Sequence, residues 1–297
     1  MTGARRPEPH DNSTSLALYD EVARAAAAQV IRRYSTSFGI GARMLPREMR
    51  HHIESVYAMV RVADEVVDTY RGDDALVLLD TFENTVRQAM DGRLSTDLVA
   101  HSFGVTARAV GITRAQTDPF FESMRMDLTV DAHTQESFER YIYGSAEVVG
   151  EMCLAIFLNT DTGPRPVPQE ASAGARRLGA AYQKVNFLRD LGTDGIELGR
   201  SYFPGIQIDT LTNDQLATLV ADCRQDIDAA RVCLPALPRR AAVAVATTID
   251  IYTRLLDAIS ATDASELAHR RVRVPNTAKA VLAARNAWPL KPKRSMS

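Results

Sequence analysis

The sequence has no excess of charge of either sign, and it has no long apolar run. Its 297 residues contain 35 Lys and Arg against 37 Asp and Glu, a net charge of −2. Binding to a nucleic-acid backbone needs a basic surface, so this balance excludes general nucleic-acid binding. No apolar run approaches the ~20 residues that a membrane-spanning helix requires. We therefore expect a globular protein whose partners are not nucleic acids.

Cysteine is also scarce. The three cysteines, Cys153, Cys223 and Cys233, are odd in number and lack the spacing of a metal site. Such a set is typical of a reducing compartment, where disulfides do not persist. The first residues are polar, with two prolines and two arginines, and lack the apolar core of a signal peptide. We expect a cytoplasmic protein with disordered tails over 1–14 and 290–297 and one folded domain over 15–289.

Strand-like alternation is scarce as well, whereas the helix formers alanine, leucine, arginine and glutamate are abundant. The predicted class is therefore all-α. The proline-rich stretch 159–168 could separate two domains, but we interpret it as a surface loop, because acidic motifs that would have to act together lie on both sides of it. The pattern predicts helices over residues 17–33, 47–70, 74–91, 95–110, 116–129, 134–158, 168–195, 213–232, 235–260 and 275–287.

The sequence does contain two acidic pairs with the same spacing, Asp64 with Asp68 and Asp190 with Asp194. Residues four apart on a helix share a face, with roughly 5–6 Å between their Cβ atoms. Each pair can therefore present two carboxylates to a common point. Four such oxygen donors facing each other across a bundle would hold Mg²⁺ ions that bind phosphate.

The first pair continues an apolar stripe. At 100° per residue, Tyr57, Val60, Asp64 and Asp68 fall within about 80° of one another. Buried carboxylates must be paired or coordinate a metal, because an isolated buried charge is unstable. Arg61, one turn before Asp64, could be the partner or could bind phosphate. The alternative is a solvated helix end carrying an ordinary ion pair.

The second pair lies on a wholly polar stripe. Gln183, Asn186, Asp190 and Asp194 share one helix face, spread over about 80°. Taken alone, such a stripe is typical of an exposed amphipathic helix. Its carboxamide and carboxylate oxygens nevertheless suit a hard cation. Three residues that follow closely could contact phosphate oxygens: Arg189, Arg200 and Tyr202.

Four segments make the chain resemble the squalene and phytoene synthases, which join two prenyl diphosphates head to head. The likeness covers about residues 20 to 285, with weaker support from Tyr252 and from 270–275. It implies the isoprenoid synthase fold, a single large helical bundle around a central active-site cavity. The segments are Tyr34-Ser-Thr-Ser-Phe38, Val56 to Arg61 with Asp64 to Asp68, Tyr141 to Gly150, and Gln183 to Asp190 with Asp194, Arg200, Tyr202 and Pro204.

The resemblance also implies roles for individual residues. Tyr141 would lie near the reacting carbons and stabilise cations or assist proton loss. The alternative is that these residues have structural roles only. Tyr141 would then be an ordinary packed aromatic, Ser35 and Ser37 helix caps, and Arg271 a surface residue. The implied ligands of Mg²⁺, or alternatively Mn²⁺, are Asp64, Asp68, Asn186, Asp190 and Asp194. The implied substrate-binding residues are Ser35, Ser37, Arg61, Gln183, Asn186, Arg189, Arg200, Tyr202, Tyr252 and Arg271.

Two departures from the family pattern stand out. Thr36 occupies the position between the two serines where some relatives carry a basic residue, which removes one phosphate contact. Glu147 occupies a position where many relatives have glycine, and a carboxylate is unusual beside an apolar channel. The second departure bears on which prenyl chain length the protein prefers.

The implied reaction is the condensation of two geranylgeranyl diphosphates, through a cyclopropylcarbinyl diphosphate, to phytoene in carotenoid biosynthesis. The sequence shows no glycine-rich dinucleotide motif and no C-terminal anchor, which favours this branch. Squalene or dehydrosqualene synthesis from farnesyl diphosphate is the alternative, with NADPH needed only for squalene. A terpene cyclase or chain elongase fits the second acidic block poorly. A non-catalytic prenyl-lipid-binding protein or partner subunit is the alternative from another class.

A long hydrocarbon product would leave through a membrane. We therefore expect transient peripheral contact with the inner membrane face, through the basic stretches Arg270–Arg273 or Lys291–Arg294. The sequence leaves the oligomeric state open.

Overall fold

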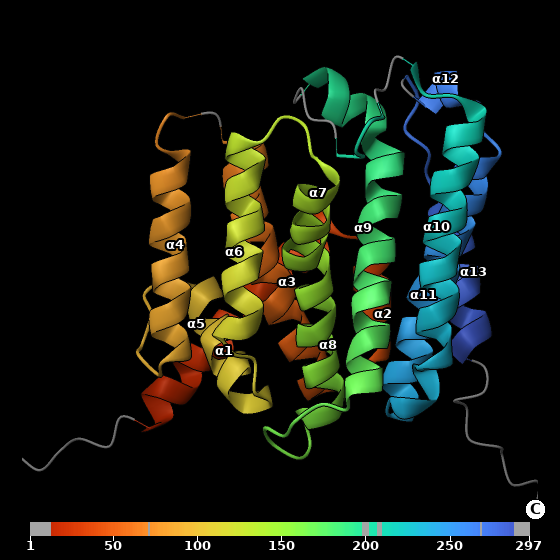
Figure 1. The fold of residues 1–297 in the computed structure, drawn as a ribbon. Coiled ribbons are helices and arrows are strands. Elements are labelled where there is room, and N and C mark those ends of the chain that lie inside the picture. The colour runs from red at the N-terminus through yellow and green to blue at the C-terminus, as the bar shows by residue number, and fades with distance from the viewer. Residues whose placement is uncertain (1–12, 71, 198–201, 207–209, 268, 288–297) are drawn as a thin grey trace, which may run out of the picture.

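The protein is a bundle of helices (Figure 1). The computed structural model describes residues 13–70, 72–197, 202–206, 210–267 and 269–287, and contains no β-strand among them. The helices are α1 (Ser13–Tyr34), α2 (Ser37–Met44), α3 (Arg47–Asp68), α4 (Ala75–Met90), α5 (Leu98–Val110), α6 (Arg114–Thr129), α7 (Gln135–Ile142), the π-helix η1 (Tyr143–Glu147), α8 (Val148–Asn159), α9 (Gln169–Glu197), α10 (Asn213–Val232), the 3₁₀-helix η3 (Leu234–Ala236), α11 (Arg239–Ser260), α12 (Ala264–Leu267) and α13 (Asn276–Ala287).

The all-α prediction is confirmed, and most predicted helices are present within a few residues. The helix α2 is missed, because its eight residues contain two glycines and show no helical repeat. The predicted helix 134–158 is interrupted by the π-helix η1. Of the predicted tails, residues 1–12 and 290–297 lie outside the described residues, whereas Ser13 and Thr14 already belong to α1.

Two apolar clusters form the core. One packs α3, α4, α5 and α6 together around side chains such as Met59, Phe103 and Phe121, which are almost completely buried. The other packs α9, α10 and α11 together around Leu188 and Ile249. Burying these side chains supplies the main favourable free energy of folding.

Glycines let η1 and α8 pack closely against α6 and α9. A Cβ atom at Gly144 would lie 2.1 Å from the backbone oxygen of Pro119, and one at Gly179 would lie 2.3 Å from that of Ala146. A methyl group cannot occupy such a space, so glycine permits the backbone contact. These contacts fix the direction of η1, which begins two residues after Tyr141.

The expectation that no segment could span a membrane by composition is wrong. The continuous helical run Gln135–Asn159 has a mean hydropathy of 1.4 over its most apolar stretch, which is sufficient by length and composition. Of that stretch, 56% is buried inside the bundle. The run is apolar because it is a core helix with neighbours on several sides.

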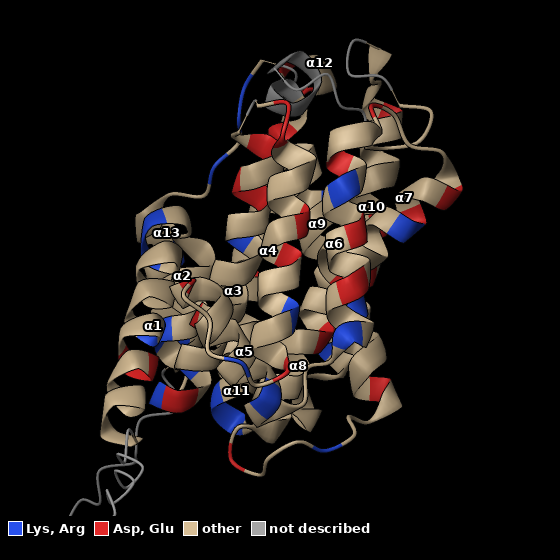
Figure 2. Ribbon diagram, turned by 90° about the vertical axis from the view of Figure 1, so that its left-hand side faces the viewer, with Lys and Arg blue, Asp and Glu red and all other residues tan. Residues whose placement is uncertain are grey.

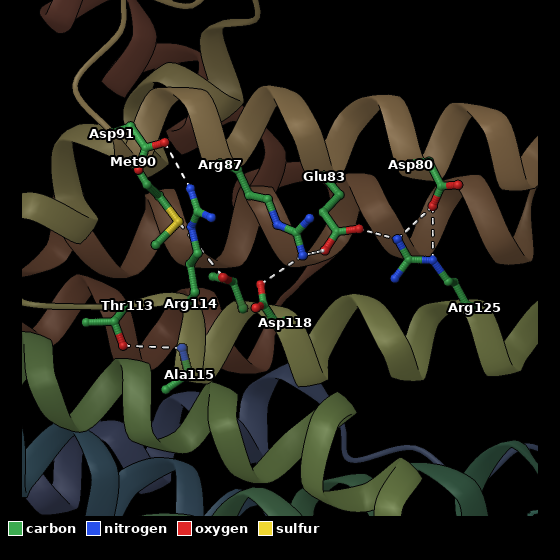
Figure 3. A network of polar contacts seen from close by, with 11 residues as sticks. Asp80, Glu83, Arg87, Met90, Asp91, Thr113, Arg114, Ala115, Asp118 and Arg125 are labelled. Carbon is green, nitrogen blue, oxygen red and sulfur yellow. Dashed lines mark hydrogen bonds and ion pairs between the residues drawn. The ribbon is translucent and has the colours of Figure 1, made fainter.

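Charged residues connect the helices on the outside. Turned by 90°, the bundle shows basic segments around α1, α2 and α11 (Figure 2). Arg125 of α6 donates hydrogen bonds to Asp80 at 2.6 Å and to the buried Glu83, both of α4 (Figure 3). Arg87 contacts Glu83 at 2.6 Å and Asp118 of α6 at 3.0 Å. This network joins α4 to α6 away from the interior of the bundle.

Candidate active site

A cavity of about 990 Å³ lies inside the bundle, lined by α2, α3, η1, α8, α9, α11 and the segment 271–276. Along α9 its lining changes from Ala171 and Ala175 to Gln183, Asn186 and Arg189. The 18 positions from the first of these to the last correspond to about 27 Å of helix. The cavity is therefore a long tunnel with an apolar end and a polar end.

The first acidic pair lies at the polar end, on the last turns of α3. Arg61 pairs with Asp64 at 2.5 Å and with Glu65, and its guanidinium lies 4.5 Å from the ring centre of Tyr34. Burial acts to lower the pKa of Arg61, but the two carboxylates raise it above its usual value. Arg61 and Asp64 line the tunnel, whereas the half-buried Asp68 lies one turn farther along. The predicted pairing of Arg61 is confirmed.

Two members of the second stripe face the tunnel from α9. Gln183 and Asn186 line the cavity and are half-buried, so for these two residues the interpretation as an exposed helix face is wrong. Arg189, on the same helix, also lines the cavity. Tyr252 of α11 donates a hydrogen bond to Oδ1 of Asn186 at 3.3 Å. The sequence pattern could not separate the two interpretations, because a polar stripe looks the same toward solvent and toward a cavity.

Asp190 is held between two arginines. Its carboxylate accepts a hydrogen bond from Arg189 at 2.5 Å and lies 2.7 Å from Nε of Arg271. Arg271, predicted as a diphosphate contact, thus lies at the polar end and lines the tunnel. The side chain of Asp194, whose backbone belongs to α9, and the whole of Arg200 lie outside the described residues.

The serine motif borders the same end of the tunnel. Ser35 Oγ accepts a hydrogen bond from the backbone amide of Phe38 at 3.1 Å, so the capping interpretation is correct for Ser35. Ser35 and Ser37 also line the cavity. Lys279 of α13 donates a hydrogen bond to Oγ1 of Thr36 at 2.8 Å.

Lys279 is a site residue that the sequence analysis missed. It lines the tunnel and places an ammonium beside Thr36. Burial, and then the charge of Arg189, lower the pKa of Lys279. No sequence signal pointed to it, because 243 positions separate it from Thr36.

Tyr141 is both a packed aromatic and a tunnel-lining residue. It is only 2% exposed, and its hydroxyl donates a hydrogen bond to Oδ2 of Asp127 at 3.0 Å. The hydroxyl of Tyr202 donates to the other oxygen of Asp127 at 3.3 Å. Burial, and then the charge of Asp127, raise the pKa of Tyr141 well above its ordinary value, so the phenol is neutral.

Asp127 was also missed. It is 8% exposed, near the end of α6, and follows the buried Met126. The available signal was a carboxylate beside an apolar position of a predicted helix. Such a residue becomes informative only when its partners, Tyr141 and Tyr202, are known.

Aromatic rings lie next to the polar end. The ring centre of Phe38 is 6.3 Å from that of Tyr57, 5.8 Å from that of Tyr182 and 6.1 Å from that of Tyr252. Tyr182 and Tyr252 are stacked with their centres 3.9 Å apart. All four residues line the tunnel. Ring faces carry partial negative charge, so this group can attract a cation.

Glu147 does not lie where the resemblance placed it. It is not among the tunnel-lining residues. It is half-buried in η1 near Arg176, Arg177 and Lys184, and desolvation raises its pKa although these cations act to lower it. The expected conflict between a carboxylate and an apolar channel therefore does not arise.

The residues at the polar end fit a hard divalent cation in their chemistry. The predicted ligands Asp64, Asp68, Asn186 and Asp190 offer carboxylate and carboxamide oxygens, which is the donor set that Mg²⁺ prefers. Within the described part of the chain, no three His, Cys, Asp or Glu side chains form a group that could hold a metal ion. Arg61 and Arg271 contact Asp64 and Asp190 directly instead.

Comparison with known proteins identifies relatives over almost the whole chain. The profile of the squalene/phytoene synthase family matches residues 31–278. A 15-cis-phytoene synthase from Synechocystis is 30% identical, covering 95% of this chain and 89% of its own. A phytoene synthase from Mycobacterium tuberculosis is 29% identical, covering 89% of this chain and 90% of its own.

Solved structures show the same fold. A dehydrosqualene synthase in complex with a ligand superposes with a TM-score of 0.78 at 21% identity, covering 91% of this chain and 97% of its own. A squalene synthase from Alicyclobacillus acidocaldarius gives a TM-score of 0.71 at 23% identity, covering 82% of this chain and 94% of its own. The helical bundle is thus an isoprenoid synthase fold. With the family profile spanning both acidic pairs, the chain belongs to the squalene/phytoene synthase family.

Proposed function

We propose that this protein joins two geranylgeranyl diphosphates head to head to form phytoene, with release of diphosphate. The observation that carries the proposal is the tunnel, which has a cationic, oxygen-rich end and an apolar end separated by about 27 Å along α9. Diphosphate groups fit the first end and prenyl tails the second. Membership of the family and likeness to phytoene synthases support this assignment.

Diphosphate would be held by cationic side chains from four parts of the chain. These are Arg61 of α3, Arg189 of α9, Arg271 and Lys279, all of which line the tunnel. Guanidinium groups bind phosphate oxygens through two parallel hydrogen bonds. In releasing their present carboxylate partners, Arg61 and Arg271 would turn toward the leaving group and absorb its charge.

Mg²⁺ would be held by Asp64, Asp68, Asn186 and Asp190, with Asp194 from the same helix. When bound, it would supply a Lewis acid that neutralises the leaving diphosphate. The chain's carboxylates would orient the ion toward the tunnel. Mn²⁺, which accepts the same oxygen ligands, is the alternative ion.

The allylic cation formed on loss of diphosphate needs stabilisation and protection from water. The rings of Phe38, Tyr57, Tyr182 and Tyr252 offer negative faces beside the polar end. Tyr141, kept neutral by burial, presents a phenol rather than a competing nucleophilic phenolate. The apolar lining beyond these rings excludes water, which would otherwise quench the cation.

The apolar end of the tunnel, where the prenyl tails would lie, favours geranylgeranyl diphosphate over the shorter farnesyl diphosphate. Its lining includes Gly150, Gly174 and Ala175 from the facing helices α8 and α9, together with Cys153. Small side chains leave room for a long prenyl chain. Dehydrosqualene or squalene synthesis from farnesyl diphosphate remains the second candidate, because solved relatives with these activities share the fold.

The test is a product assay by mass spectrometry. Purified protein is incubated with Mg²⁺ and either geranylgeranyl or farnesyl diphosphate, with and without NADPH. Phytoene from the C20 substrate is expected, with EDTA abolishing turnover and Mn²⁺ replacing Mg²⁺. Products from farnesyl diphosphate alone would overturn the substrate assignment. Binding of both substrates without turnover would instead favour a lipid-binding or partner protein.

We further propose that the protein works in the cytoplasm with transient contact at the inner membrane face. Two observations support this proposal. Arg270 and Arg273 are exposed, and Arg273 also lines the tunnel, as does Arg271 two positions before it. A membrane contact there would place the polar end of the tunnel next to lipid headgroups. Cell fractionation should find the protein in the cytosol, with a membrane-associated fraction removed by high salt.

A further inference from the structure

A second cavity, of about 470 Å³, lies among α1, α2 and α3 and takes no part in the proposed reaction. It touches the tunnel only through a shared wall, because Ile31 and Ala42 line both cavities. These two residues are 2% and 4% exposed, so they separate the two spaces with apolar side chains. Basic segments of this region are visible around α1 and α2 in Figure 2.

The lining of the second cavity is strongly basic. Five arginines face two glutamates, Glu21 and Glu54, an excess of three positive charges with the histidine neutral. Converging cations repel one another and are normally neutralised when their pocket is partly shielded from water. The arginines are Arg24 and Arg32 of α1, Arg43 of α2, and Arg47 and Arg50 of α3.

The acidic partners present neutralise this charge only weakly. Arg24 lies 3.7 Å from Glu48, and Arg50 lies 4.0 Å from Glu54, both at the outer limit of an ion pair. Arg43 and Arg47 make no ion pair with any residue that the structure describes. Their guanidinium groups therefore retain the capacity to bind an added anion.

His51 supplies an independent observation. Its Nδ1 atom is buried and has no hydrogen-bond partner within the described chain. Burial lowers the pKa of His51, and Arg24, Arg47 and Arg50 lower it further against the opposing effect of Glu48. The residue also lines the second cavity, so its ring lies close enough to report on an anion bound there.

We propose that this pocket is a binding site for a phosphate or diphosphate group, separate from the tunnel. Arginines from three helices converge on it, and guanidinium groups match phosphate oxygens in geometry as well as charge. The group could come from free inorganic diphosphate or from the headgroup of an anionic lipid. Neither source depends on which prenyl diphosphate the tunnel accepts.

The test uses the ring resonances of His51 as a local reporter, because added diphosphate would also enter the tunnel. In protein labelled on histidine rings, with EDTA present, His51 is assigned from the His51→Gln variant and followed during titration with inorganic diphosphate. We expect a saturable shift and a higher pKa of His51, since a nearby anion stabilises imidazolium. The adjacent His52, bonded to Thr106 Oγ1 at 3.0 Å, should stay unchanged.

The double variant Arg43→Gln/Arg47→Gln should weaken the apparent affinity about tenfold or more, because each arginine contributes charge-assisted hydrogen bonds. Arg93→Gln/Arg165→Gln removes the same charge from exposed positions outside both cavities and should leave the titration unchanged. Circular dichroism confirms that each variant is folded. Absence of a His51 shift, or equal affinity in both double variants, would overturn the proposal.

A second experiment distinguishes free inorganic diphosphate from the headgroup of an anionic lipid. Flotation with phosphatidylcholine vesicles containing phosphatidic acid is compared between the wild type and the two double variants. Loss of flotation only in Arg43→Gln/Arg47→Gln assigns a lipid headgroup. A His51 titration with diphosphate but no arginine-dependent flotation assigns a free anion.

Discussion

Nε of Arg271 lies 2.7 Å from Oδ1 of Asp190, although 81 positions separate the two residues. The contact brings a cation from the segment before α13 to the carboxylate that begins the second acidic pair on α9. Under the proposed function, this arginine would exchange the carboxylate for a diphosphate. Together with Arg61 and Asp64 of α3, which line the same end, this contact shows that the polar end is assembled from both halves of the chain.

Replacing Asp190 by asparagine should reduce turnover by about 10³-fold or more, because a neutral amide cannot neutralise a divalent cation as a carboxylate does. The side chain is 17% exposed and its partner Arg271 is 46% exposed, so stability should change little. Product formation is measured by mass spectrometry and helicity by circular dichroism.

Asp161→Asn, at an exposed position in the loop after α8, is the matched control and should retain full activity. Undiminished turnover of Asp190→Asn in a folded protein would show that this carboxylate is not a metal ligand.

Replacing Tyr141 by phenylalanine should destabilise the protein by about 1–3 kcal/mol, because Asp127 loses a buried hydrogen bond. The free energy of unfolding is measured in urea. Tyr70→Phe removes a similar bond, from Tyr70 to Asp74 at 2.6 Å, but at an exposed position, and should have an effect near zero. Equal losses in the two variants would contradict a buried Tyr141–Asp127 bond.

Replacing Gly144 by alanine should destabilise the protein by about 1–3 kcal/mol, since the new methyl group would overlap the Pro119 backbone oxygen. Turnover should also fall, because η1 would move relative to Tyr141. Gly39→Ala in α2 is the control, as its Cβ would meet nothing closer than 3.7 Å. That variant should be neutral or more stable by about 0.4–1 kcal/mol. Thermal unfolding of both variants gives the comparison.

Replacing Lys279 by methionine should raise KM for the prenyl diphosphate about tenfold, because one charge-assisted hydrogen bond is lost. Since its pKa is lowered, the lysine loses its proton at a lower pH than an ordinary lysine. In the wild type KM should therefore rise on the alkaline side, before the usual lysine pKa of about 10.4.

The Lys279→Met variant should lack that part of the pH dependence, whereas Arg165→Gln, outside the tunnel, should keep it. Steady-state kinetics from neutral to alkaline pH provides the measurement. An identical KM profile in both variants would remove Lys279 from the substrate site.

Helix positions and the acidic pairs could be read from the sequence because they depend on neighbours within a few turns. The burial of Gln183 and Asn186 could not, since the same polar stripe would serve an exposed helix. Asp127 and Lys279 were missed for a related reason: their meaning comes from partners on other helices. The position of Glu147, away from the tunnel, depends on which way η1 turns.

The sequence by itself determined an all-helical chain with two carboxylate pairs on helix faces, because helical periodicity is local. Only the tertiary structure decided that Gln183 and Asn186 face a tunnel, that Arg271 reaches Asp190, and that Lys279 lies beside Thr36. Such contacts arise when apolar faces of distant helices are buried together, and burial fixes their neighbours without leaving a fixed spacing in the sequence.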